Sequence, residues 1–94
     1  MGVYLVDRDL PGITRAGLAE IQQAEIRVSE QLTVAGQRVC YLRSLFIIGE
    51  ARCLCLFEAS DEAIVAALNE LARLPFTRIV AALDLTPPPG QPAG

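Results

Sequence analysis

The chain contains no histidine, no lysine and no tryptophan. The absence of histidine excludes a His-based catalytic triad, an imidazole general base and an imidazole metal ligand. The absence of lysine excludes a Schiff-base lysine and the phosphate-binding lysine of a Walker-type loop. Much of the usual catalytic repertoire is therefore missing, and composition alone does not identify a function.

Positive charge and long apolar runs are also scarce. The chain carries 8 basic and 11 acidic residues, a net charge of −3, whereas a nucleic-acid-binding module normally has a basic surplus. No apolar run approaches the ~18 residues that a membrane-spanning helix needs, and Asp7 interrupts the N-terminal apolar stretch before it reaches signal-peptide length. We therefore expect no nucleic-acid or membrane partner, and a cytoplasmic protein with reduced thiols.

The residues that are present favour one small globular domain. The chain has 94 residues, of which 52% are hydrophobic, so a disordered chain is excluded. Four of the six prolines follow Thr86. We expect a single domain at residues 1–86 and a disordered, Pro/Gly-rich tail at residues 87–94.

The spacing of the apolar residues predicts four strands and two helices. Apolar, β-prone runs predict strands at residues 3–7, 39–48, 51–58 and 77–85. Helical spacing predicts helices at residues 14–34 and 63–74, capped by Thr14 and Ser60, with Pro75 ending the second. The order strand, helix, strand, strand, helix, strand is the split βαβ pattern of the ferredoxin-like α+β fold. This fold has a four-stranded antiparallel sheet with two helices on one face.

The two central strands predict a hairpin around Gly49-Glu50, which suits a two-residue type II′ turn. Phe46 then faces Cys53, and Ser44 faces Cys55. The face predicted to pack against the helices contains Cys40, Leu42, Ser44, Phe46, Cys53, Cys55 and Phe57. The face predicted to be open contains Tyr41, Arg43, Leu45, Ile47, Arg52, Leu54, Leu56 and Glu58.

An open face this apolar predicts a partner surface. We expect a homodimer that stacks these faces, with Tyr41, Arg43, Leu54 and Leu56 near the contact. The alternative is a register slip by one residue, which would exchange the two faces.

Chemistry-bearing residues are few, and several have a structural interpretation. The thiols of Cys53 and Cys55 are predicted on one strand face about 7 Å apart, and core packing is favoured over metal or redox chemistry because free cysteine is often buried. Asp7-Arg8-Asp9 is interpreted as a local charge cluster on a loop. Arg43 and Glu58 are predicted to pair with each other or across a dimer.

Glu25 lies within the apolar stripe of the first predicted helix. If the stripe is shifted slightly, Ala24 faces inward and Glu25 lies at the rim, which spacing alone favours. The other interpretation is a carboxylate that faces a ligand and has a pKa raised by desolvation.

Three motifs in order resemble a family of small ferredoxin-like proteins of unknown function, some of which are described as nickel-binding. They are Arg8-Asp9-Leu10-Pro11-Gly12 after a short strand, the pair of runs 39–44 and 53–59, and Ser60-Asp61-Glu62-Ala63-Ile64 opening the second helix. The resemblance covers most of residues 3–85. It implies a dimeric α/β barrel arrangement and, in members that carry histidine, nickel held by histidines and carboxylates.

In those members the resemblance places histidines near Asp7, near Gln22 and, in the second helix, near Leu68 and Ala72, with an acid near Glu25. This chain keeps the acid at Glu25, with Asp7 as a second oxygen donor, and lacks every histidine. Nickel favours nitrogen ligands, and oxygen-only sites suit harder ions.

Three hypotheses follow. The first is a non-enzymatic dimeric module that binds a small ligand, or weakly a metal, between the first helix and the sheet. Its predicted site residues are Asp7, Glu25, Tyr41 and Arg43. The alternative is a small cofactor-independent enzyme of isomerase or monooxygenase type with Glu25 or Asp7 as base. The third is a structural partner that acts through its apolar sheet face or its tail.

Overall fold

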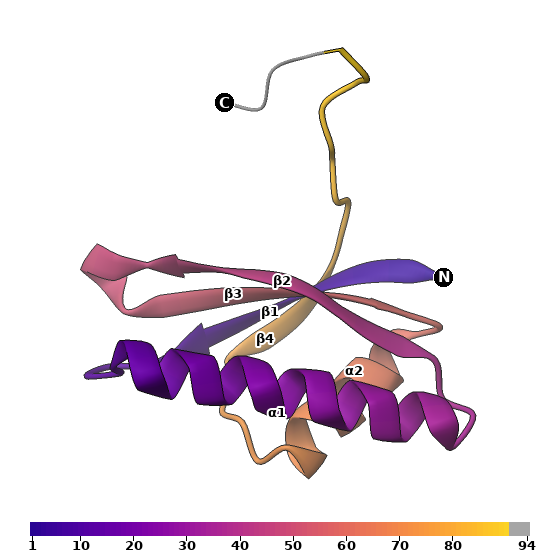
Figure 1. Ribbon diagram of the computed structural model, residues 1–94, viewed down its shortest axis with the longest axis horizontal. Coiled ribbons are helices and arrows are strands. Elements are labelled where there is room, and N and C mark those ends of the chain that lie inside the picture. Colours follow the sequence, from indigo (N-terminus) through magenta and orange to yellow (C-terminus); the bar gives the residue numbers. More distant parts are fainter. Residues whose placement is uncertain (91–94) are drawn as a thin grey trace.

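The computed structural model describes residues 1–90 and has the predicted order of elements. The strands are β1 (Gly2–Asp9), β2 (Val39–Ile47), β3 (Arg52–Ala59) and β4 (Arg78–Ala82), and the helices are α1 (Arg15–Val34) and α2 (Glu62–Leu71). The strands form one sheet in the order β2-β3-β1-β4, and every neighbouring pair is antiparallel. Both helices cover the same face of the sheet (Figure 1), which confirms the ferredoxin-like α+β fold.

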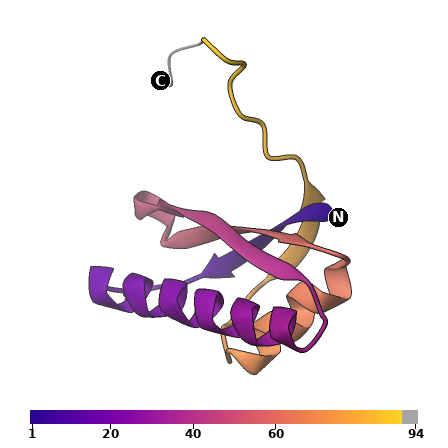
Figure 2. The same cartoon turned by 45° about the vertical axis from the view of Figure 1, so that its right-hand side comes forward.

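The opposite face of the sheet carries no helix, and the segment after β4 leaves the sheet on that side (Figure 2). Residues 83–90 contain no helix or strand. The remainder of the predicted tail, residues 91–94, lies outside the described residues.

Helix α1 begins and ends as its sequence predicts. The Thr14 hydroxyl oxygen accepts a hydrogen bond from the Gly17 backbone N–H at 3.0 Å, which caps the first turn. At the other end Gly36 has a φ of 95°, a left-handed conformation that glycine adopts without strain. The buried side of α1 consists of Glu25, Val28, Ser29 and Leu32. The spacing of the apolar positions therefore predicts the buried stripe, and Glu25 lies inside it.

Helix α2 differs at both ends from the prediction. Its cap is Asp61, not Ser60, because the Asp61 carboxylate accepts the Ile64 N–H at 3.0 Å. The helix ends at Leu71, ahead of Pro75, where Arg73 adopts a left-handed conformation with a φ of 55°. Strand β1 is longer than predicted: Asp7, Arg8 and Asp9 belong to the strand, not to a loop, because β3 pairs with all three.

The β2-β3 hairpin has the predicted register near its turn. Ser44 opposes Cys55 and Phe46 opposes Cys53. The turn is longer than the predicted two-residue turn: residues 48–50 form a 3₁₀ turn and Ala51 is left-handed, with a φ of 52°. The strand register is nevertheless as predicted, because the longer turn at residues 48–51 is centred on the same two residues, Gly49 and Glu50.

A bulge at Leu42 changes the other half of β2. The register shifts between Tyr41 and Arg43, so Tyr41 opposes Phe57. The rings of these two residues lie 5.5 Å apart on the helix side. Cys40 is exposed. The predictions that Tyr41 lies on the open face and that Cys40 faces the helices are therefore wrong, since the extra residue reverses the alternation.

The core lies between the helices and the sheet. Its fully buried apolar members are Val6, Cys55, Phe57, Ala59, Val65 and Leu68. The same layer also buries Arg8, Glu25 and Asn69 completely. Because buried charged groups are rare unless paired, Arg8 and Glu25 mark the part of the core most relevant to function.

Candidate functional site

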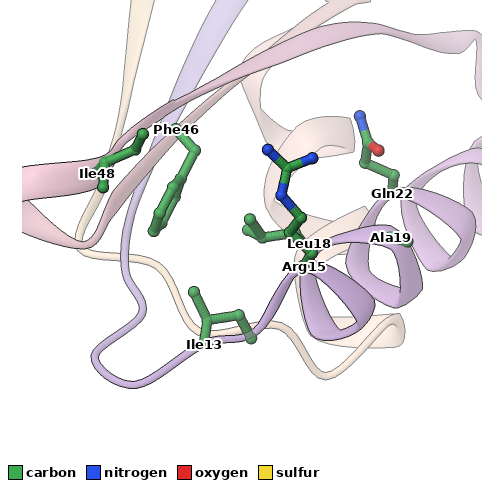
Figure 3. A pocket seen from close by; sticks show the side chains of 7 residues that line it. All are labelled: Ile13, Arg15, Leu18, Ala19, Gln22, Phe46 and Ile48. Carbon is green, nitrogen blue, oxygen red and sulfur yellow. The ribbon is translucent and has the colours of Figure 1, made fainter.

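A groove opens between the start of α1 and the end of the β2-β3 hairpin. Its volume is about 480 Å³. The residues that line it are Ile13, Arg15, Leu18, Ala19, Gln22, Phe46 and Ile48 (Figure 3). Most of the lining is apolar, with the Arg15 guanidinium and the Gln22 amide as the polar groups. The volume falls in the ~300–1,000 Å³ range of small-molecule pockets.

A smaller cavity of about 130 Å³ continues the groove towards the core. We call it the inner cavity. It shares Leu18, Gln22 and Phe46 with the groove, and its other lining residues are Ile21, Glu25, Ser44 and Cys53. Both spaces are lined mainly by apolar side chains, and the inner cavity adds the polar side chains of Glu25, Ser44 and Cys53.

Glu25, which lines the inner cavity, pairs with Arg8. Arg8 Nη2 donates to Glu25 Oε2 at 3.2 Å, and Arg8 Nη1 donates to the Pro75 carbonyl at 3.0 Å. Both side chains are completely buried. Within the described part of the chain, Arg8 Nε and Glu25 Oε1 have no hydrogen-bond partner. A buried polar atom without a partner is costly, so the unpaired Oε1 needs an explanation.

The environment of Glu25 disfavours its charged form. Burial, and after it the neighbouring Cys55 thiol, raise the pKa of Glu25 to about 8, against the opposing effect of the Arg8 guanidinium. The neutral form of the carboxyl, which burial favours, presents a hydroxyl donor as well as a carbonyl acceptor. Because Glu25 is completely buried, the interpretation that puts it at the rim is wrong, and the interpretation of Glu25 as a ligand-facing carboxylate stays a prediction.

A chain of hydrogen bonds runs from α1 to β3 beside the inner cavity. Gln22 Nε2 donates to the Tyr41 hydroxyl at 3.0 Å, and that hydroxyl lies 2.6 Å from Ser44 Oγ. Ser44 Oγ donates to Cys55 Sγ at 3.2 Å. Burial raises the pKa of Tyr41. Tyr41 is therefore a neutral group held in place beside the cavity.

Cys53 and Cys55 form a close pair of thiols on β3. Their sulfurs lie 3.6 Å apart, much closer than the spacing predicted along the strand, because the side chains lean towards each other. A hydrogen bond from Cys55 lowers the pKa of Cys53 to about 7. The same bond, together with burial, raises the pKa of Cys55. Of the two thiols, Cys53 is therefore the more acidic.

Asp7 lies on the other side of the sheet. The side chains of Arg52 and Arg78 donate to its carboxylate, and Arg52 Nη2 lies 2.5 Å from Oδ2. The hydrogen bond from Arg52 is the largest influence that lowers the pKa of Asp7. Arg43 also lies on this side and pairs with Asp84 in the segment after β4. The predicted partner of Arg43 was Glu58, so that pairing within the chain is wrong.

The four predicted site residues thus fall into two pairs. Glu25 lines the inner cavity, and Tyr41 is hydrogen bonded to Gln22 and Ser44, which line it. Asp7 and Arg43 lie on the open face of the sheet. Arg8 was missed as a site residue, although strand alternation from the apolar Val6 places it on the helix face. That signal is present in the sequence once β1 is extended through Asp9.

No helix among residues 1–90 is both long and apolar enough to cross a membrane. In the same residues, no group of three or more His, Cys, Asp or Glu side chains is arranged to hold a metal ion.

Known proteins resemble this chain in sequence pattern and in fold. The model of the family described as nickel responsive protein SCO4226-like matches residues 4–81. The crystal structure of SCO4226 from Streptomyces coelicolor A3(2) superposes with a TM-score of 0.74 at 19% sequence identity. The match covers 89% of this chain and 99% of that chain. No curated protein matches the sequence.

The residues present do not fit a nickel site. Nickel in proteins favours nitrogen ligands such as imidazole, and the chain has no histidine. The resemblance leaves two candidate oxygen ligands in this chain, Asp7 and Glu25, which lie on opposite faces of the sheet. The carboxylate of Asp7 already accepts hydrogen bonds from Arg52 and Arg78.

Proposed function

Because the chain belongs to the SCO4226-like family of nickel responsive proteins, matched over residues 4–81, we propose that it is a non-enzymatic member that binds a small organic ligand. The ligand occupies the groove and the inner cavity beneath α1. The observation that carries this proposal is Glu25 Oε1, a completely buried polar atom that has no partner in the described chain and belongs to a residue lining the inner cavity.

The lining sets the chemistry of the ligand. Leu18, Phe46 and Ile48 favour an apolar body, since apolar walls gain free energy by displacing water. A polar group at the inner end pairs with Glu25 Oε1, and an anionic group at the mouth pairs with Arg15. The ligand class is therefore a small amphipathic molecule with an apolar centre.

A fluorescence titration with 8-anilinonaphthalene-1-sulfonate tests this proposal. The probe has apolar rings for the groove and a sulfonate for Arg15. We expect Ala19→Phe, which fills the groove, to weaken binding at least about 10-fold, the equivalent of ~1.4 kcal/mol. Ala16→Phe is the matched control, because Ala16 is exposed on the same helix and does not line the groove.

The probe must also report the right location. In a ¹H–¹⁵N spectrum of the labelled protein, we expect the backbone amides of Ala19, Gln22 and Glu25 to shift on adding the probe. Equal loss of affinity in Ala16→Phe and Ala19→Phe, or shifts confined to the open face of the sheet, would refute the placement.

The proposal includes a homodimer through the open sheet face. Leu45 is 68% exposed there, and β3 adds the half-buried side chains of Leu54 and Leu56. Asp7 is paired within its own chain, so stacking two such faces leaves no unpaired charge at its position. Tyr41, predicted near this contact, lies on the other face and has no part in it.

Sedimentation equilibrium tests the dimer. We expect Leu45→Glu to shift the protein to monomer, because stacking would bury a carboxylate in each copy. Val34→Glu is the control, since Val34 is 89% exposed at the end of α1. A wild-type monomer at all concentrations would refute the dimer.

The raised pKa of Glu25 favours one second candidate, a small cofactor-independent enzyme with Glu25 as general base. Asp7 is a poor base because its pKa is lowered and two arginines occupy it. An activity with a base of apparent pKa near 8 that disappears in Glu25→Gln would favour the enzyme over the binding module.

A further inference from the structure

Cys53 is a potential nucleophile that has no role in the ligand site described above. Its side chain lines the inner cavity, whereas that of Cys55 does not. Cys53 is 3% exposed and Cys55 is completely buried. Because the inner cavity shares lining residues with the groove, a molecule that occupies both spaces meets the thiol of Cys53 before that of Cys55.

The same cavity holds a second group that lacks a partner. Glu25 lines it, is completely buried, and has an Oε1 atom without a hydrogen-bond partner among the described residues. A buried polar atom of this kind is expected to pair with a polar group of a bound molecule. A thiol and an unpaired carboxyl around one small space together match an electrophile that carries an oxygen atom.

The neighbours of Cys53 favour its reactive form. Ser44 Oγ donates to Cys55 Sγ at 3.2 Å, and the sulfurs of Cys55 and Cys53 lie 3.6 Å apart. The hydrogen bond from Cys55 lowers the pKa of Cys53 to about 7. This shift favours the thiolate, which is the form that attacks electrophiles.

The two thiols are poorly placed to consume each other as a disulfide. Residues two apart on one strand face have Cα atoms about 6.6 Å apart, close to the upper limit of about 6.8 Å for a disulfide. Pairing of β1 with both Cys53 and Cys55 holds this part of β3 extended. Both cysteines are free, so the sulfur of Cys53 remains available to a ligand.

We propose that Cys53 is a covalent binding site for an α,β-unsaturated ketone, whose conjugated carbonyl occupies the inner cavity and whose apolar tail lies in the groove. The inference rests on the proposed function, because it names the ligand class of the same site. The Cys53 sulfur bonds to the β-carbon of the double bond, and solvent returns the proton lost by the thiol to the α-carbon. The net step adds S–H across C=C, so it needs no oxidant or reductant.

The two spaces suit the two parts of such a ligand. The inner cavity, of about 130 Å³, has room for about four water molecules at ~30 Å³ each, which is the size of a conjugated carbonyl group without its tail. The groove offers Leu18, Phe46 and Ile48 to the tail. Negative charge develops on the carbonyl oxygen during the addition, and the neutral form of the Glu25 carboxyl can donate a hydrogen bond to it.

The composition of the chain makes the test selective. Besides cysteine, the side chains that add to unsaturated ketones are those of histidine and lysine, and the chain has neither. The protein is the reduced full chain carrying Cys40→Ser, which removes the exposed thiol. The probes are 3-nonen-2-one and 3-penten-2-one, which share the same reactive group and differ in the length of the apolar tail.

Intact-mass spectrometry follows the rate of addition, and peptide fragmentation identifies the modified cysteine. We expect one adduct per chain, on Cys53. Relative to their rates with N-acetylcysteine, the longer ketone should react at least about 10-fold faster than the shorter one, because its tail is buried in the groove. Ala19→Phe should abolish this preference, and Ala16→Phe should retain it.

Equal modification of Cys53 and Cys55, or a tail preference no larger than that of N-acetylcysteine, would overturn the site, because labelling through unfolding gives this result. The saturated ketone 2-nonanone separates the two proposals, since it binds without reacting. Amide shifts at Ala19 and Gln22 with 2-nonanone, but no adduct on Cys53, would refute only the covalent site. Absence of these shifts with both 2-nonanone and the naphthalene sulfonate would refute the proposed function itself.

Discussion

Replacing Glu25 by glutamine should remove a large pH dependence of stability. The pKa of Glu25 rises from an ordinary 4.5 to about 8 in the folded protein. Between these two pH values the folded state holds one proton more than the unfolded chain. The stabilisation is therefore fully present below pH 4.5 and is lost as the pH rises to about 8.

The structure sets the size of this effect. The free-energy cost of ionising the buried carboxyl is about 5 kcal/mol by the usual conversion of a pKa difference, a large share of the ~5–15 kcal/mol that stabilises a small domain. Four groups face the carboxyl: Arg8 on β1, Tyr41 on β2, and the thiols of Cys53 and Cys55 on β3. They are present in both proteins, so their own titration largely cancels in the comparison.

The measurement is urea unfolding followed by far-ultraviolet circular dichroism, because the chain has no tryptophan for fluorescence. We expect the free energy of unfolding of wild type to fall between pH 4.5 and about pH 8. The free energy of unfolding of Glu25→Gln should not show this fall. Above pH 8 the variant should gain several kcal/mol relative to its difference at pH 4.5. Glu20→Gln, an exposed substitution on the same helix, should run parallel to wild type. Parallel curves for Glu25→Gln as well would refute the argument that the carboxyl is desolvated.

Three further predictions each concern the contacts of one side chain. Arg8→Met should destabilise the fold by about 1–3 kcal/mol in urea unfolding, because it removes the hydrogen bonds that Arg8 donates to the Glu25 carboxyl and the Pro75 carbonyl, whereas Arg27→Met on the exposed side of α1 should change stability by less than about 0.5 kcal/mol. Asp61→Ala should lower stability by about 1 kcal/mol through loss of the α2 cap, and Ser60→Ala should have little effect; equal effects would contradict the cap assignment. Asp7→Asn should destabilise the protein at pH 7, and its difference from wild type should close as the pH falls below 3.8, because protonation removes the same ion pairs from wild type.

Local sequence was sufficient for the order of the elements and for much of their placement. Helical spacing from Leu18 to Leu32 identifies α1, and Thr14 and Gly36 mark its ends through capping chemistry that involves only neighbouring residues. The same holds for the register near the hairpin turn, where Phe46 opposes Cys53. These features depend on contacts close in the chain, so the sequence predicts them.

The bulge at Leu42 has no such local signal. Neither glycine nor proline marks it, and the apolar run of β2 continues through it without interruption. The bulge places Tyr41 beside Phe57 on the helix face and leaves Cys40 exposed. One extra residue therefore reverses which side chains reach the core, and only pairing with β3 reveals it.

The sequence by itself determined the fold class, the family resemblance and the absence of any histidine chemistry. Tertiary structure alone decided the site. Arg8 and Glu25 are 17 residues apart, and whether each carries a buried, paired charge depends on how closely α1 packs on β1. Burial sets the protonation of Glu25, and the lean of two side chains on β3 brings the sulfurs of Cys53 and Cys55 to 3.6 Å. Residue order does not encode these distances locally, because they arise where separate elements meet.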